Sequence, residues 1–168
     1  TKAGYTFPKP LIEINKKPMI QFVIENLSLE ANYIFLVRKE HEKKYNITSL
    51  LKVLAPSCKI VIVNKLTEGA ASTTLLAKKI IDNKNPLIIA NSDQFIDWNS
   101  SKSMYKFMSK KNDAAILTFK SIHPKWSYAR TDKYGNVLEV AEKKVISDNA
   151  TVGVYFWKKG SDYVKYAK

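Results

Sequence analysis

The segment Pro86-Leu87-Ile88-Ile89-Ala90-Asn91-Ser92-Asp93-Gln94 joins a run of branched apolar side chains to an abrupt polar end. The run shows no polar alternation, which is typical of a strand buried on both faces. An acidic side chain at the carboxyl end of such a strand needs a cation, a ligand or solvent beside it. Because ligands of open α/β sheets bind at that end, we predict that Asp93 binds a divalent metal carrying the phosphates of a nucleotide. The alternative is that Asp93 only caps the next helix or turn.

Strand and helix patterns alternate on both sides of this segment. Strands are predicted at 10–15, 31–37, 59–63, 87–92 and 114–119, and helices at 18–27, 40–54, 70–81 and 100–111. Beyond residue 119 the pattern is β-rich, with strands at 126–131, 137–141 and 151–157, a turn at 134–136 and a helix from Gly160. This order predicts a mixed α/β fold of the doubly wound type.

The composition describes one domain, residues 1–168, with a core of its own. Hydrophobic residues make up 45% and charged residues 26%, as in ordinary globular proteins. No apolar run reaches the ~18 residues of a membrane span, so no membrane partner is predicted. The single cysteine, Cys58, excludes an internal disulfide and a cysteine zinc site, and it fits the reducing cytoplasm.

The net charge of +13 admits nucleic acid, an anionic surface or phosphorylated substrates as partners. Base-stacking platforms interleave aromatic and basic residues along one strand. The sequence shows no such ladder, so nucleic-acid binding is not predicted as the main function, although the charge alone keeps it as an alternative.

Four motifs follow one another along the chain. They are Phe7-Pro-Lys-Pro-Leu-Ile-Glu-Ile14 with Lys17-Pro-Met-Ile20, then Thr67-Glu-Gly-Ala-Ala71, then Asn91-Ser-Asp93, and last Glu142-Lys-Lys144 with Asn149-Ala-Thr-Val-Gly-Val-Tyr155. Together they resemble the nucleotidyltransferase family that activates phosphorylated sugars and similar small molecules. The resemblance implies a GT-A-like, Rossmann-like mixed sheet with helices on both faces and a β-rich acceptor-binding part.

The chain departs from the family pattern at both ends. The family begins with a strand and a Gly-rich loop whose counterpart does not precede Thr1, and its second metal-binding carboxylate would lie past Lys168. We therefore expect a chain truncated at both ends. Because the family's first strand is central to the sheet, we expect another strand or another chain to fill that slot.

The resemblance assigns Asp93 to Mg²⁺, which prefers hard oxygen ligands. Ser92 would contact the nucleotide. Lys9, predicted on extended backbone because it follows Pro8, would place a compact charge on the phosphates and act in catalysis. The alternative for Lys9 is a solvated surface lysine.

The remaining assignments concern the base and the acceptor. Glu68, Gly69 and Ala70 would read the base, because small residues at a helix entry expose backbone N–H groups; the alternative is a plain helix entry. Glu142 would accept hydrogen bonds from the acceptor, and Lys143 would grip its phosphate as a catalytic group, unless the two are surface charges. The list of acceptor-binding residues is completed by Asn149 and Gly153.

The predicted reaction is attack by an acceptor phosphate on the α-phosphorus of a nucleoside triphosphate, with loss of pyrophosphate. The nearest resemblance is to cytidylyltransferases of capsule and other surface-polysaccharide pathways, which favours CTP. Two alternatives remain: a hexose-1-phosphate thymidylyl- or uridylyltransferase, and a non-catalytic nucleotide-binding regulatory subunit. The implied partners are the nucleotide and a phosphorylated small molecule, and homo-oligomer formation is left open.

Overall fold

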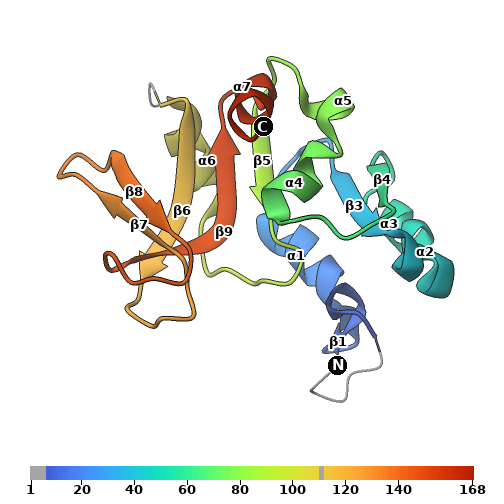
Figure 1. Ribbon diagram of the computed structural model, residues 1–168. Coiled ribbons are helices and arrows are strands. Elements are labelled where there is room, and N and C mark those ends of the chain that lie inside the picture. The colour runs from blue at the N-terminus through green and yellow to red at the C-terminus, as the bar shows by residue number, and fades with distance from the viewer. Residues whose placement is uncertain (1–6, 110–111) are drawn as a thin grey trace.

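The computed structural model describes residues 7–109 and 112–168 and shows a mixed α/β fold (Figure 1). Strand β9 runs through the middle of a five-stranded sheet. It pairs antiparallel with β5 and β6, and with the β7–β8 hairpin through Tyr128 and Ala150. The bounds of these strands are β5 Leu87–Ala90, β6 Ala114–Lys120, β7 Tyr128–Thr131, β8 Val137–Ala141 and β9 Asn149–Trp157. The predicted α/β class and the β-rich second half are confirmed.

Two further strands, β3 (Ile34–Arg38) and β4 (Lys59–Val63), form a separate parallel pair. Within residues 7–109 and 112–168, β3 pairs only with β4, and β5 pairs only with β9. The expectation that another strand of this chain fills the central slot is therefore wrong for the described residues. The part of that expectation that concerns another chain stays a prediction.

Helices cover both faces of the five-stranded sheet. Alternate residues of β9 point to opposite faces, so their contacts identify the helices on each face. On one face, Val154 packs in the same cluster as α1, and Phe156 stacks on Phe107 of α6 at 5.6 Å between ring centroids. On the other face, Trp157 packs against Tyr163 of α7 at 5.6 Å. The helices are α1 Met19–Leu27, α2 Lys39–Tyr45, α3 Ile47–Leu54, α4 Ala70–Leu75, α5 Lys78–Ile81, α6 Ser100–Ser109 and α7 Gly160–Tyr166.

Helix α1 packs against both the β3–β4 pair and the five-stranded sheet. Its buried side chains Ile20, Val23 and Leu27 belong to one core cluster that also takes in β3 and β9. Partly buried residues of β5 pack against the same cluster, among them Ile88 and Ala90. Burying side chains of this size stabilises the fold by roughly 1.5–3 kcal/mol each, so α1 helps to tie the β3–β4 pair to the large sheet, together with the cluster around α5 and α7 that also contacts both.

The N-terminal segment differs from the sequence prediction. Instead of a strand at 10–15, a 3₁₀ helix covers Lys9–Leu11, and two short strands follow, β1 (Glu13–Ile14) and β2 (Lys17–Pro18). The extended backbone predicted for Lys9 is wrong, because the N–H of Ile12 donates to the Lys9 carbonyl and closes a helical turn. Asn15 and Lys16 have positive φ, which makes the tight turn of the hairpin.

Two predicted helices are each broken into a pair. The helix predicted at 40–54 divides into α2 and α3 at Asn46, whose φ of 47° is left-handed. The helix predicted at 70–81 divides into α4 and α5 near Ala77. The helix predicted at 100–111 is α6, and its last two positions lie outside the described residues. In the part of the chain that the structure describes, no helix is both long and apolar enough to cross a membrane.

The break at Asn46 gives a prediction on stability. We expect Asn46→Ala to lower the free energy of unfolding by about 1 kcal/mol, since alanine is strained at positive φ and asparagine tolerates it. Asn46→Gly should stay within about 0.5 kcal/mol of the wild type, because glycine adopts this φ freely. Urea denaturation of the two variants measures both values, and equal losses would contradict this explanation of the break.

Candidate active site

Asp93 lies in the irregular segment that follows β5, where its side chain is 35% exposed. Its Oδ2 atom accepts a hydrogen bond and ion pair from Lys9 Nζ at 2.9 Å. These residues are 84 positions apart in the chain. The 3₁₀ turn at Lys9–Leu11 and the end of β5 therefore deliver one cation and one carboxylate to the same exposed place.

The charge on Lys9 is secured by this contact. The hydrogen bond to Asp93, followed by the Coulombic attraction to it, raises the pKa of the Lys9 ammonium above its ordinary value. Lys9 is therefore a full cation at neutral pH. Its side chain is 76% exposed, so the pair is screened by water and contributes little to stability, which leaves both groups free to exchange partners with a ligand.

Gly153 of β9 lies against the segment that carries Asp93. The N–H of Asn91 donates to the Gly153 carbonyl at 3.1 Å, and Gln94 Nε2 donates to the same oxygen at 3.4 Å. Gly153 has a φ of +89°, and a Cβ atom there would meet the Asn91 side chain and, at 2.9 Å, Gln94 Oε1. The space above Gly153 is thus occupied by two side chains that flank Asp93 in sequence.

Glu142 and Lys143 follow β8, as the sequence predicts, and their side chains contact each other at 3.4 Å. Both are more than two-thirds exposed, and Lys143 has a φ of +51°. This left-handed residue turns the chain immediately after the strand. The pair is open to solvent and available to an anionic ligand.

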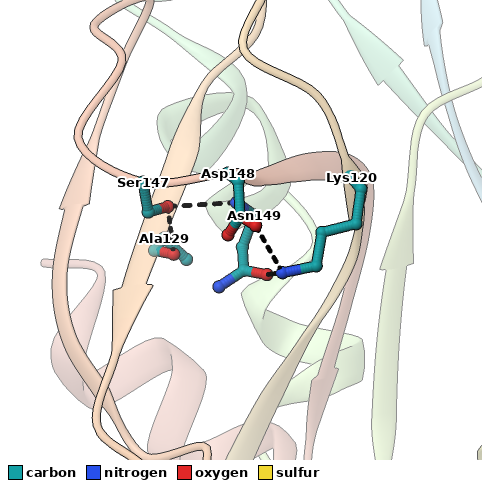
Figure 2. A network of polar contacts seen from close by, with 5 residues as sticks. All are labelled: Lys120, Ala129, Ser147, Asp148 and Asn149. Carbon is teal, nitrogen blue, oxygen red and sulfur yellow. Dashed lines mark hydrogen bonds and ion pairs between the residues drawn. The ribbon is translucent and has the colours of Figure 1, made fainter.

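Asn149 opens β9 and belongs to a polar network that Figure 2 shows at close range. Lys120 Nζ donates to Asp148 Oδ2 at 2.8 Å and to Asn149 Oδ1 at 3.1 Å. Ser147 Oγ accepts from the Asn149 N–H at 3.1 Å and donates to the Ala129 carbonyl at 2.8 Å. The amide oxygen of Asn149 is therefore already held by a lysine.

The predicted base-reading segment lies at the entry of α4. Glu68, Gly69 and Ala70 are exposed, and a Cβ atom on Gly69 would meet nothing within 4 Å. The Gly69 carbonyl accepts from the N–H of Thr73 at 3.0 Å, which starts the helix. The segment is open enough for a flat ligand to approach its backbone.

Asp93 and Lys9 line neither of two hollows that lie in the described part of the chain. The larger, of about 880 Å³, lies between α6, β6 and the β7–β8 hairpin, and Asn149 is on its wall. The smaller, of about 390 Å³, lies beyond the carboxyl ends of β3 and β4 and is lined by Arg38, Lys39, Glu40, Lys43, Val63, Asn64, Lys65 and Leu66. The structure thus joins Lys9, Asp93 and Gly153 in one place, with Ser92 beside Asp93 in the chain, and puts Asn149 in another.

The donor set suits magnesium in one specific way. Among the described residues, no three His, Cys, Asp or Glu side chains gather closely enough to hold a metal ion. Mg²⁺ nonetheless binds through one or two carboxylates together with substrate phosphates, and keeps several waters. A single half-exposed carboxylate such as Asp93 fits that mode, in which the ion arrives with the nucleotide.

The fold just described is shared with solved structures of nucleotide-sugar enzymes. The chain is 23% identical to the nucleoside-diphosphate-sugar pyrophosphorylase from Vibrio cholerae RC9, with a TM-score of 0.76, covering 98% of this chain and 70% of that one. It is 16% identical to a putative glucose-1-phosphate thymidylyltransferase from Bacillus anthracis, with a TM-score of 0.76 and coverages of 96% and 66%. Against HddC from Yersinia pseudotuberculosis the identity is 20%, the TM-score 0.70, and the coverages 96% and 72%.

These likenesses define the class of protein: an α/β protein with the nucleotidyltransferase fold. The chain belongs to the nucleotidyl transferase family, whose model matches residues 4–167. The family comprises enzymes of the EC 2.7.7 type, acting on nucleoside triphosphates and sugar phosphates. No curated protein matches the chain in sequence.

Proposed function

We propose that this protein transfers a nucleotidyl group from a nucleoside triphosphate, with CTP favoured, to the phosphate of a small acceptor for capsule or other surface-polysaccharide synthesis. The observation that carries the proposal is the Lys9–Asp93 contact of 2.9 Å at the exposed end of β5. A cation for the phosphates and a carboxylate for their metal are two groups that recur where proteins catalyse phosphoryl transfer.

In the proposed reaction, an acceptor phosphate oxygen bonds to the α-phosphorus, the bond to the bridging oxygen breaks, and pyrophosphate leaves with its electron pair. Asp93 would hold Mg²⁺, which when bound neutralises phosphate charge. Lys9 would leave Asp93 and neutralise the developing charge on the phosphates. Lys143 and Glu142 would orient the acceptor, with Asn149 and Gly153 as further candidates for its pocket. Glu68, Gly69 and Ala70 would contact the base, and Ser92 the nucleotide.

The preference for CTP rests on the resemblance to capsule cytidylyltransferases, including the one that acts on phosphoglutamine. A hexose 1-phosphate with a thymidine or uridine nucleotide is the competing pair.

The test is pyrophosphate release by the purified protein with Mg²⁺, each nucleoside triphosphate in turn, and a panel of acceptors that includes phosphoglutamine and hexose 1-phosphates. Release with CTP alone supports the proposal, release with UTP or dTTP and a hexose 1-phosphate replaces it, and no release with any pair favours a regulatory nucleotide-binding protein.

Lys9 gives a first prediction on rate. We expect Lys9→Gln to lower kcat/KM roughly 10²-fold, because glutamine keeps much of the length of the side chain and removes the charge that faces the phosphates. Steady-state pyrophosphate release measures the change. Lys16→Gln is the matched control, an exposed lysine of the β1–β2 turn, and should change kcat/KM less than twofold. An equal loss in both variants would show a general effect of charge instead of a specific one.

A further inference from the structure

The segment that carries Asp93 has no regular secondary structure between Asn91 and Asn99. Such a segment must be held by individual hydrogen bonds and side-chain packing, because no helix or sheet ladder fixes its backbone. Gln94 attaches it to β9 on one side. A second attachment comes from α1, on the side where the chain moves away from β5.

Asn26 makes that second attachment with its whole amide group. Its Nδ2 donates to the Ile96 carbonyl at 2.7 Å, and its Oδ1 accepts from the Ile96 N–H at 2.8 Å. One side chain thus satisfies both backbone groups of a residue 70 positions away, as a neighbouring strand would. Both bonds are partly buried, which makes them stronger than exposed ones and their loss more costly.

The main chain of Asn26 adds a third bond. The last four carbonyl groups of a helix have no partner within it, and Asn26 lies one residue before the end of α1. Its carbonyl accepts a hydrogen bond from Trp98 Nε1 at 3.1 Å. Ile96 and Trp98 also pack against the core cluster of α1, so the 93–98 segment is fixed to this helix by both polar and apolar contacts.

The start of the same helix is hydrogen-bonded to the turn that carries Lys9. The N–H of Met19, the first residue of α1, donates to the Ile12 carbonyl at 2.9 Å, and the Ile12 N–H donates to the Lys9 carbonyl at 3.1 Å. Leu11 and Met19 pack in the same cluster as Ile96 and Trp98. Helix α1 is therefore attached at its start to the turn that carries Lys9 and near its end to the segment that carries Asp93.

We propose that Asn26 is a positioning residue, which sets the place of the Asp93 carboxylate relative to Lys9 by fixing the 93–98 segment to α1. This inference rests on the proposed function, since it assigns Asp93 to the metal. Asn26 itself does not touch the reacting groups. Its contribution is to keep the carboxylate where a nucleotide-bound cation meets it, and residues that orient metal ligands in this way change metal affinity by roughly 10–100-fold when removed.

The structure supplies a matched control in Asn83, at the opposite end of β5. Its Nδ2 donates to the Ile80 carbonyl at 2.8 Å and its Oδ1 accepts from the Asn85 N–H at 2.8 Å. Its main-chain carbonyl also accepts a bond from outside, from the N–H of Ser161 at 2.9 Å. Asn83→Ala therefore removes the same two kinds of bond as Asn26→Ala, but away from Asp93.

The test measures the affinity of the protein for Mn²⁺ in the presence of CTP, by electron paramagnetic resonance of free Mn²⁺. Amide hydrogen exchange of residues 93–98 is measured on the same samples, at a temperature where every variant is folded. We expect Asn26→Ala to weaken Mn²⁺ binding at least tenfold and to speed exchange in that segment, and Asn83→Ala to change Mn²⁺ binding less than twofold. Equal Mn²⁺ affinity in the two alanine variants would overturn the inference.

Two further variants complete the design. Asn26→Gln keeps both hydrogen-bonding groups and adds one methylene, so it preserves the fold while shifting the 93–98 segment. We expect this variant to bind Mn²⁺ at least threefold more weakly than the wild type. Wild-type Mn²⁺ affinity in Asn26→Gln overturns the inference even if Asn26→Ala does not fold. Asp93→Ala distinguishes a failure of the proposed function from a failure of the inference on Asn26. Unchanged Mn²⁺ binding in Asp93→Ala refutes the proposed function and the inference with it, whereas lost binding there with unchanged binding in the Asn26 variants refutes the inference alone.

Discussion

Asp93→Ala is expected to reduce pyrophosphate release by about 10³-fold or more while leaving the protein folded. The carboxylate is the group that we assign to the metal, and a cation bridging the phosphates stabilises the transition state by several kcal/mol. The fold should survive because Asp93 is half-exposed and its partner, Lys9, is a solvent-exposed lysine. Losing an exposed ion pair of this kind costs about 0–1 kcal/mol.

The control for this variant lies four residues along the same segment. Asp97 is exposed, and in the described residues it has no hydrogen bond or ion pair. Asp97→Ala removes the same charge from the same segment and should keep release within about twofold of the wild type, since long-range charge effects are screened in water. Turnover that persists in Asp93→Ala, with normal unfolding curves for both variants, would take Asp93 out of the mechanism.

The elements that the sequence predicted best are those whose pattern is local. The strands at 59–63 and 137–141 are found at the predicted bounds, because an apolar run between polar turns leaves few choices of end point. The helix breaks at Asn46 and near Ala77 were missed, as a single left-handed residue leaves the spacing of apolar residues almost unchanged. The 3₁₀ turn at Lys9 was missed because the prediction relied on Pro8, which precedes Lys9, whereas a proline restricts the backbone of the residue before it.

In the candidate site too, residues that belong to a local sequence motif were predicted, and a residue that acts through distant backbone contacts was not. Lys9 and Asp93 were singled out from motifs, and their contact at 2.9 Å agrees with a shared site, while their catalytic roles remain predictions. Asn26 was not foreseen, because its partners are backbone atoms of Ile96, which carry no sequence signature. The one signal available was a polar side chain at helical spacing from Met19 and Val23, on the side of α1 that faces the core.

Gly153→Ala is expected to lower the free energy of unfolding by about 3 kcal/mol. Two effects add: alanine at a φ of +89° is strained by about 1–2 kcal/mol, and its methyl group overlaps the Asn91 side chain, which must shift away from the buried backbone of Gly153 at a cost of about 1–3 kcal/mol. Gly153 is buried in the middle of β9, between the strand's contacts with β5 and its contact with β7, so the backbone has little freedom to yield.

Gly135 separates the two effects. It has nearly the same φ, +87°, but lies in an exposed turn where a Cβ atom would meet nothing within 4 Å. Gly135→Ala should therefore show only the conformational cost, about 1–2 kcal/mol. The comparison is made by urea denaturation, and equal losses in the two variants would show that Asn91 moves aside freely.

If the overlap is real, adding Asn91→Ala to Gly153→Ala should recover part of the loss, which a double-mutant cycle measures as a coupling of about 1 kcal/mol or more. The crowding would also push Asn91 and Gln94, and hence Asp93 between them, so Gly153→Ala should lose pyrophosphate release even at temperatures where it is fully folded.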